Sequence, residues 1–234
     1  MDMKGARMSY PSYIHLKDEF IDGLGNYVKK KGIPLDEVVE VFAGNGQLGL
    51  RLGLKSRCNI TDSLLYASDD YQDEVNKDWD KQPHGVAVET AYETILRFSA
   101  EDGLNIRLLI MGAPLPALSY YCPSYEAAKA LYHRFDAQIL YIGELSDFAF
   151  ASPKFFAHVQ QVQDDDEQSF QTLVADRYDS KHGYFASEAF ETPLDIRPFL
   201  LRFAPCSDER CDCRDDAKIC GDVQAYGRKY SSVR

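Results

Sequence analysis

The fold is decided by the stretch Val38-Val39-Glu40-Val41-Phe42-Ala43-Gly44-Asn45-Gly46-Gln47-Leu48-Gly49. Its apolar first half predicts a strand over 38–43, and the residues after the glycines predict a short helix over 47–54. Between them is a Gly-x-Gly-x-x-Gly turn, in which glycine tolerates positive φ and lets a ligand lie against bare backbone. The start of the following helix adds N–H groups that have no partner within the helix. We therefore expect a nucleotide-like ligand at this turn.

Strand and helix continue to alternate on both sides of this stretch. Near-continuous apolar runs at 106–111 and 137–142 are typical of parallel strands covered on both faces. Further strands are predicted at 57–61, 85–89 and 199–203, and helices at 16–31, 92–98, 124–135 with Ser124 as N-cap, and from Ser152 with Pro153 in the first turn. This order predicts an α/β fold with an open, doubly wound, mostly parallel sheet and helices on both faces.

Composition and charge exclude several classes of protein. The chain has 234 residues, a formal net charge of −11 and a pI near 4.9. Nucleic acid is an unlikely partner, because affinity for phosphate backbones comes from clustered Lys and Arg. No apolar run reaches the roughly 18 residues that span a bilayer, and the N-terminal residues lack the apolar stretch of a signal peptide. We expect a cytoplasmic protein without membrane contact.

Two ligand classes compete for the glycine turn. A dinucleotide oxidoreductase that uses NAD(P) would place pyrophosphate at the helix start and an acid about 20 residues further on, where Asp62 stands. Glu40, four positions before Gly44, would repel a pyrophosphate and suits a ligand with a positive amino group. Glu40 therefore favours the second class of ligand.

The segment from Glu40 to Gly49 resembles the cofactor loop of the class I S-adenosylmethionine-dependent methyltransferases, and the resemblance covers roughly residues 14–163 and 199–204. It implies a seven-strand, Rossmann-like sheet and S-adenosylmethionine as cofactor. Glu40 would meet the methionine amino group, directly or through water, and Asp62 the ribose. The remaining cofactor-binding residues that it implies are Phe42, Ala43, Gly44, Asn45, Gly46, Gly49, Glu89, Thr90, Met111 and Gly112.

Each of these acids also has a purely structural interpretation. Glu40 could be a buried acid that backbone donors satisfy, and Asp62 could cap the segment that follows it. Glu89 and Thr90 could cap the helix that begins near Tyr92. Met111 and Gly112 suit packing at a strand end, where only their backbone would touch a ligand.

The methyl acceptor is a small molecule or a protein side chain in our interpretation. The family members that methylate amino groups often carry Asp/Asn-Pro-Pro-aromatic after the fourth strand, whereas this chain has Gly112-Ala113-Pro114-Leu115-Pro116. Tyr120 and Tyr121 are weak candidates for a base near the acceptor, since tyrosines in such loops are more often packing residues. A protein that keeps this fold only for binding or regulation is the alternative to a methyltransferase.

The cysteines are concentrated late in the chain. Cys206, Cys211, Cys213 and Cys220 could hold structural zinc, form disulfides or remain free thiols. None of the five histidines pairs at the spacing of a metal site or a catalytic triad, and His158 is interpreted as an exposed or capping helical residue. We divide the chain into a methyltransferase-like domain at 1–204 and a Cys-rich extension at 205–234. The sequence also predicts an insertion at 164–198 that would cover the acceptor site.

Overall fold

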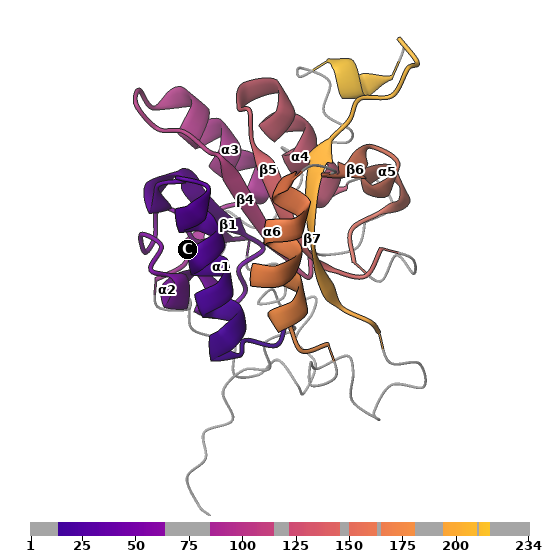
Figure 1. The fold of residues 1–234 in the computed structure, drawn as a ribbon. Coiled ribbons are helices and arrows are strands. Elements are labelled where there is room, and N and C mark those ends of the chain that lie inside the picture. The colour runs from indigo at the N-terminus through magenta and orange to yellow at the C-terminus, as the bar shows by residue number, and fades with distance from the viewer. Residues whose placement is uncertain are drawn as a thin grey trace, which may run out of the picture.

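The computed structural model describes residues 14–63, 85–114, 122–145, 150–162, 165–180, 194–209 and 211–215. They form a mixed α/β fold around a mostly parallel sheet (Figure 1). This confirms the predicted α/β class and the mostly parallel sheet. Tyr120, Tyr121 and Cys220 lie outside the described residues.

The main sheet has five strands in the order β1-β4-β5-β7-β6. Their bounds are β1 Val38–Val41, β4 Leu108–Gly112, β5 Gln138–Gly143, β6 Val159–Gln161 and β7 Arg197–Phe203. β1, β4 and β5 pair in parallel, and β7 runs antiparallel between β5 and β6. Every residue of β1, and every residue of β4 except its last, is buried, as the apolar runs predicted.

A second, two-stranded parallel sheet lies beside β1. Its strands are β2 Thr61–Asp62 and β3 Ala87–Val88. A parallel bridge between Glu40 and Ile60 joins it to β1, and Ala43 N–H donates to the carbonyl of Thr61 at 3.1 Å. The described residues thus form five strands in one sheet and two in another.

The prediction of a strand over 57–61 was wrong for most of that range. The backbone N–H groups of Cys58 and Asn59 both donate to the carbonyl of Lys55, so the chain turns there. Arg57 has a φ of +54°, which an extended strand does not allow. The strand begins only at Thr61.

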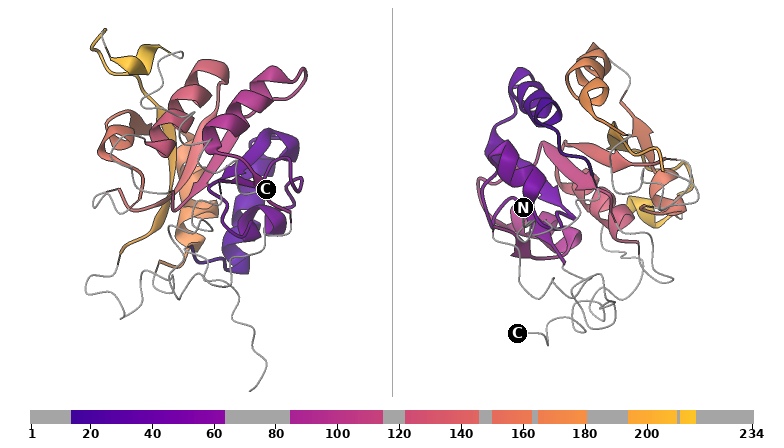
Figure 2. Two further views of the ribbon diagram at one scale, coloured as in Figure 1. Left: turned by 180° about the vertical axis from the view of Figure 1, so that it is seen from behind. Right: turned by 90° about the horizontal axis from the view of Figure 1, so that it is seen from below.

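Helices cover both faces of the sheet. α1 (Asp18–Lys30), α2 (Gln47–Leu52) and α6 (Asp165–Leu173) lie on one face. α3 (Ala91–Ala100), α4 (Pro123–Arg134) and the one-turn α5 (Pro153–Phe156) lie on the other, as the two views of Figure 2 show. Among the described residues, no helix is long and apolar enough to cross a membrane.

The two predicted serine caps had different outcomes. Ser152 is the N-cap of α5, since its hydroxyl accepts from Phe155 N–H at 3.1 Å. Ser124 is not the cap of α4, because the helix already begins at Pro123 with Cys122 as N-cap. Proline has a fixed φ that suits the first helical position and lacks the N–H that would go unpaired there. Ser124 is therefore buried inside the first turn.

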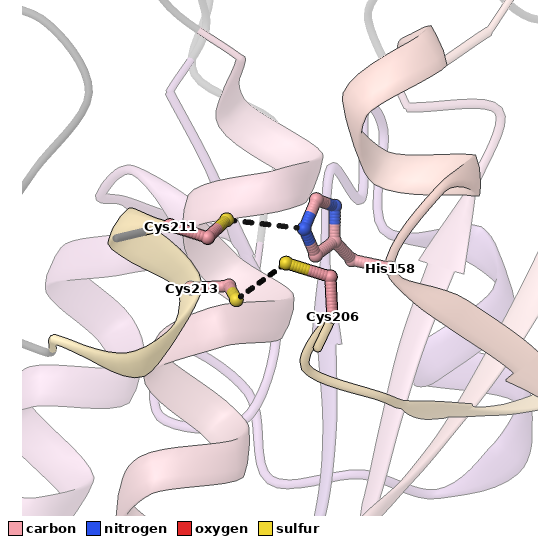
Figure 3. Close-up of side chains that lie close together, drawn as sticks. All are labelled: His158, Cys206, Cys211 and Cys213. Atoms are coloured by element: carbon pink, nitrogen blue, oxygen red, sulfur yellow. Dashed lines mark hydrogen bonds between the residues drawn. The ribbon is translucent and has the colours of Figure 1, made fainter. Parts of the chain in front are cut away.

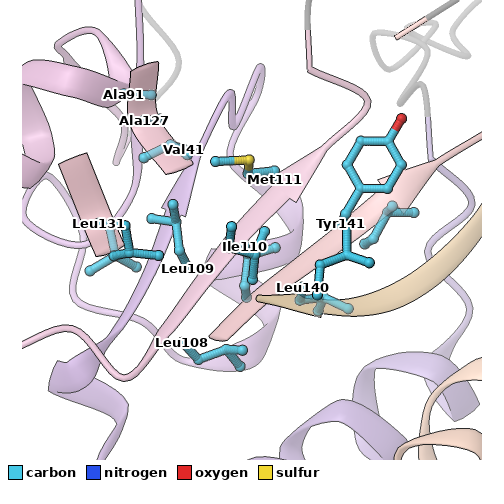
Figure 4. Packing of buried hydrophobic residues seen from close by; sticks show 14 of the residues in the cluster. Val41, Ala91, Leu108, Leu109, Ile110, Met111, Ala127, Leu131, Leu140 and Tyr141 are labelled. Atoms are coloured by element: carbon cyan, nitrogen blue, oxygen red, sulfur yellow. The ribbon is translucent and has the colours of Figure 1, made fainter. Parts of the chain in front are cut away.

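The core lies between the sheet and the helices of each face. Figure 4 shows Val41 of β1 with Leu109 and Met111 of β4, and Ala127 and Leu131 of α4 beside them. All five side chains are at most 1% exposed. This packing fixes α4 against the sheet.

The described part of the predicted insertion packs along α1. A side-chain carbon at Gly23 would lie only 1.8 Å from the carbonyl oxygen of Leu173, so α1 and α6 approach at backbone distance. Tyr27 meets Phe170 edge-to-face with ring centroids 5.5 Å apart. Residues 181–193 lie outside the described residues, so that this segment covers an acceptor site stays a prediction.

Candidate functional site

The predicted cofactor residues gather at one edge of the sheets. The strands β1, β2, β3 and β4 run in the same direction, so their carboxyl ends meet at that edge. The glycine loop follows β1, Asp62 ends β2 and Gly112 ends β4. In open α/β sheets this is the edge at which ligands bind.

The glycine loop has left-handed backbone at three places. Phe42, Gly44 and Gly46 have φ of +56°, +54° and +70°. At Gly46, which is the N-cap of α2, a side-chain carbon would lie 2.6 Å from Val86 Cγ2. Gly46 therefore has both a conformational and a steric reason to be glycine.

Asp62 is bound to this loop. One of its carboxylate oxygens, Oδ2, accepts from Gly44 N–H at 2.7 Å. A carboxylate has about four acceptor sites, so this contact is compatible with further donors from a ligand. The structure therefore places Asp62 at the loop, on the strand where the sequence predicted a ribose-binding acid.

Glu40 lies beneath the loop, and its residue is 2% exposed. Its Oε2 accepts from Gly49 N–H, in the first turn of α2, at 2.9 Å. Burial raises the pKa of Glu40 from its ordinary 4.5 to about 8; the Gly49 hydrogen bond opposes the rise, and the nearby Asp62 adds to it. The carboxyl group therefore has the backbone partner that its structural interpretation predicted.

Most N–H groups of the loop have acceptors inside the protein. Ala43 donates to the Thr61 carbonyl, Gly46 to the Ala43 carbonyl and Gln47 to Asn45 Oδ1 at 3.2 Å. With the contacts of Gly44 and Gly49 to carboxylates, few loop N–H groups remain for a ligand. A loop that binds pyrophosphate instead turns these groups toward the phosphates.

Glu89 and Thr90 have structural partners. Thr90 is the N-cap of α3 and forms a capping box with Glu93, whose backbone N–H donates to the Thr90 hydroxyl at 3.2 Å. The Glu89 carboxylate accepts from Arg97 at 3.0–3.1 Å, and Arg97 also donates to the Cys58 carbonyl at 2.8 Å. Both residues thus tie the start of α3 to its surroundings.

At the end of β4, the side chain of Met111 is fully buried in the core. A side-chain carbon at Gly112 would lie 3.2 Å from Ile14 Cδ1, so Ile14 covers this strand end closely. The next residue, Ala113, has a φ of +46°. Only the backbone of this strand end could reach a ligand, as the sequence indicated.

A cavity of about 310 Å³ lies between α6 and β7. Phe170 and Tyr178 line it on the helix side, and Arg197 and Phe199 on the strand side. Its volume is at the lower end of the range for small-molecule pockets. The predicted insertion therefore borders a hollow next to β7.

A separate cluster of side chains that could hold a metal ion lies at the opposite edge of the main sheet. Cys206, Cys211 and Cys213 follow the end of β7, and His158 precedes β6 (Figure 3). Their ligand atoms all lie within 4.8 Å of one another. Cys211 Sγ is 3.5 Å from His158 Nε2, and Cys206 Sγ is 3.6 Å from Cys213 Sγ.

The thiols of this cluster differ in their surroundings. Hydrogen bonding with Cys211 lowers the pKa of Cys206. Burial raises the pKa of Cys213 to about 11. Arg214 donates to the carbonyl of Cys206 through Nε at 3.2 Å and Nη2 at 2.8 Å, which holds Cys206 in place.

His158 is the residue that sequence reasoning missed. It is 7% exposed and lies in the turn between α5 and β6, so the prediction that it is exposed was wrong. The alternative, a capping residue, is confirmed, because its Nδ1 lies 2.8 Å from the carbonyl oxygen of Lys154 in α5. Its position, 48 residues before Cys206, carries no local ligand spacing, and only the antiparallel pairing of β6 with β7 brings the two segments together.

No protein-family model matches this chain, and no curated protein or solved structure matches it. The glycine loop and the Cys/His cluster therefore have to be interpreted from their own geometry.

Proposed function

We propose that this protein is a class I S-adenosylmethionine-dependent methyltransferase that acts on a small molecule or a protein side chain. The observation that carries the proposal is the glycine loop, where side-chain oxygens of Asp62 and Glu40 accept hydrogen bonds from the N–H groups of Gly44 and Gly49. The Asp62 carboxylate at this place suits a cofactor that carries positive charge on its sulfonium and its amino group.

The same contacts disfavour the NAD(P)-dependent oxidoreductase. A pyrophosphate would have to displace Asp62 from Gly44 or lie beside its carboxylate at close range, and like charges at such distances repel. It would also have few N–H groups to bind, since Ala43, Gly46 and Gln47 donate within the protein. A positively charged cofactor meets neither obstacle.

The strand order supports the proposal as well. Followed through the bridge between Glu40 and Ile60, the two sheets give the order β3-β2-β1-β4-β5-β7-β6 with β7 alone antiparallel. A mostly parallel sheet of seven strands is what the resemblance of residues 40–49 implies. The bridge is short, so the support rests on the order of the strands and not on a continuous ladder.

When bound, S-adenosylmethionine supplies a methyl group to the acceptor's lone pair, and the electrons of the broken C–S bond stay on sulfur. The protein's task is to hold the two reactants in line and to exclude water. Asp62 would accept hydrogen bonds from the ribose hydroxyls while it still accepts the one from Gly44 N–H. Glu40, held by Gly49, would fix the start of α2 beneath the methionine end of the cofactor.

Calorimetric titration of the protein with S-adenosylmethionine and with S-adenosylhomocysteine tests the cofactor. We expect dissociation constants on the order of micromolar to tens of micromolar, the lower part of the usual range for enzyme substrates. Asp62→Ala should weaken binding about 10-fold or more, as expected when a hydrogen bond to a charged group is lost. Glu101→Gln, at an exposed position after α3, is the matched control and should bind as the unchanged protein does.

Two results would overturn this assignment. The first is no binding of either compound by protein whose circular dichroism shows it folded. The second is binding of reduced nicotinamide cofactors in the same titration. If the cofactor binds but labelled methyl groups reach neither small-molecule nor protein acceptors, the binding or regulatory protein becomes the better description.

A further inference from the structure

We propose that His158, Cys206, Cys211 and Cys213 bind one zinc ion in a closed, structural site. This assignment replaces Cys220 of the sequence-based ligand set with a histidine that comes from the other side of the β6–β7 pair. It does not depend on the proposed methyltransferase activity.

The spacing of the ligand atoms suits tetrahedral zinc. With Zn–S near 2.3 Å and Zn–N near 2.0–2.1 Å, a tetrahedron places two sulfurs about 3.8 Å apart and a sulfur and a nitrogen about 3.6 Å apart. The Cys206–Cys213 sulfurs are 3.6 Å apart, and Cys211 Sγ lies 3.5 Å from His158 Nε2. Both distances are close to those of a zinc tetrahedron, and all four ligand atoms lie within 4.8 Å of one another.

The histidine is oriented for a metal. Its Nδ1 lies 2.8 Å from the carbonyl oxygen of Lys154, and a carbonyl can only accept, so Nδ1 must carry the proton. In the neutral ring the lone pair is then on Nε2, the atom that faces the sulfurs (Figure 3). Metal-binding histidines are usually held by such a second hydrogen bond.

The surrounding aromatic rings hold His158 in this position. Its ring stacks on Phe203 with centroids 5.9 Å apart and planes 15° apart, and Tyr125 meets it edge-on at 5.1 Å. Lys154 Nζ bonds Asp212 at 2.7 Å, which fixes the short helical turn that bears Cys211 and Cys213. The ligands are thus positioned by contacts that need no metal.

A disulfide explains these cysteines less well. Sulfurs in a disulfide are about 2.04 Å apart, so the 3.6 Å pair of Cys206 and Cys213 would have to move closer. A disulfide between Cys206 and Cys213 would also not involve His158 Nε2 or the Cys211 thiol. Three thiolates and one neutral imidazole use all four groups.

The site has no position for water or substrate, because the protein supplies four ligands to a four-coordinate ion. Such closed sites stabilise structure, whereas catalytic zinc keeps one position open. The zinc would join the turn before β6 to the segment after β7, at the sheet edge away from the glycine loop. Its removal should therefore lower stability and leave the loop unchanged.

The test uses full-length protein purified with a thiol reductant from zinc-supplemented cells. Elemental analysis should give about one zinc per chain. Removal by a strong chelator should lower the melting temperature by roughly 5–10 °C, the shift expected for a ligand about 100-fold above its dissociation constant. Restoring equimolar zinc should reverse the change.

Three variants separate the two ligand sets. Cys211→Ser and His158→Ala should each lose the zinc, while Cys220→Ser should keep about one per chain and melt as the unchanged protein does. His158 is buried, so Cys211→Ser at its half-buried position keeps the test usable if His158→Ala fails to fold. Cobalt(II) added to the metal-free protein should give the visible absorption of a tetrahedral, sulfur-rich site, and Cys211→Ser should abolish it.

Several results would overturn the proposal. They are a chain that carries no zinc and takes up none, a different metal at full occupancy, or loss of zinc in Cys220→Ser while His158→Ala keeps it. A Cys206–Cys213 disulfide in the protein purified with reductant, detected by mass spectrometry under non-reducing conditions, would have the same effect.

Discussion

Replacing Glu40 with glutamine should remove a pH dependence from the stability of this protein. Glu40 is buried, and its pKa is raised from 4.5 to about 8 in the folded state. In the unfolded chain the group loses its proton near its ordinary pKa. Between these values the folded state holds more protons than the unfolded state, so the free energy of unfolding falls as the pH rises.

The size of the effect follows from the two pKa values. The contribution of a protonated Glu40 is complete below pH 4.5 and is lost as the pH rises through about 8. At about 1.36 kcal/mol per pKa unit, the loss between pH 5.5 and 8.5 is about 3 kcal/mol. Glutamine keeps the shape and the acceptor for Gly49 N–H but does not titrate, so the variant should lack this slope.

Urea denaturation of both proteins at five values from pH 5.5 to 8.5 measures the difference directly. A protein tends to precipitate near its pI, where its net charge is close to zero. The pH series therefore stays above the pI of 4.9. Glu101→Gln, an exposed glutamate to glutamine change, should show the slope of the unchanged protein. If the free-energy difference between Glu40→Gln and the unchanged protein stays flat across the series, Glu40 is ionised in the folded state and our account of its burial is refuted.

The other predictions concern single contacts, each measured by chemical denaturation. Gly23→Ala should destabilise by roughly 1–3 kcal/mol, because its methyl group would meet the Leu173 carbonyl, whereas Gly25→Ala in the same helix has room and should stabilise by roughly 0.5–1 kcal/mol. Equal effects of the two would contradict the close approach of α1 and α6. Thr90→Ala should cost about 1 kcal/mol by loss of the cap and leave S-adenosylmethionine affinity unchanged; weaker binding would assign Thr90 to the cofactor. Lys129→Met should lower the free energy of unfolding by roughly 3–5 kcal/mol, because the fully buried Lys129 ammonium pairs with the buried Glu126 carboxylate at 3.1 Å. An unchanged free energy of unfolding would show that this ion pair does not stabilise the fold.

The layout of the fold could be predicted from sequence wherever local patterns decide it. The strands at 38–41, 108–112 and 138–143 are buried on both faces, so continuous apolar runs identify them. The glycine loop could be predicted from the spacing of its glycines, and Glu40 and Asp62 from their positions relative to it. β6, which has only three residues of which two are exposed, gives no such pattern, and its existence depends on pairing with β7.

The candidate metal site could be predicted from the sequence only in part. Three of its four ligands lie within eight residues and were found from their spacing, although the fourth was assigned to Cys220. His158 comes near them only through the β6–β7 pairing and the stacking on Phe203. Contacts between distant segments are set by the tertiary fold, and one sequence contains no spacing that reports them.

The position of β7 between β5 and β6 has a consequence for the nascent chain. β5 ends at Gly143, but its neighbour begins only at Arg197, which a ribosome working at about 5–20 residues per second reaches roughly 3–11 s later. During that interval the backbone donors and acceptors along one side of β5 have no strand partner, and such open edges invite pairing with other chains. When β7 inserts, it closes this edge, pairs β6 and carries Cys206 toward His158. Closure of this sheet edge and assembly of the cysteine cluster thus both wait for the synthesis of β7 and the residues after it.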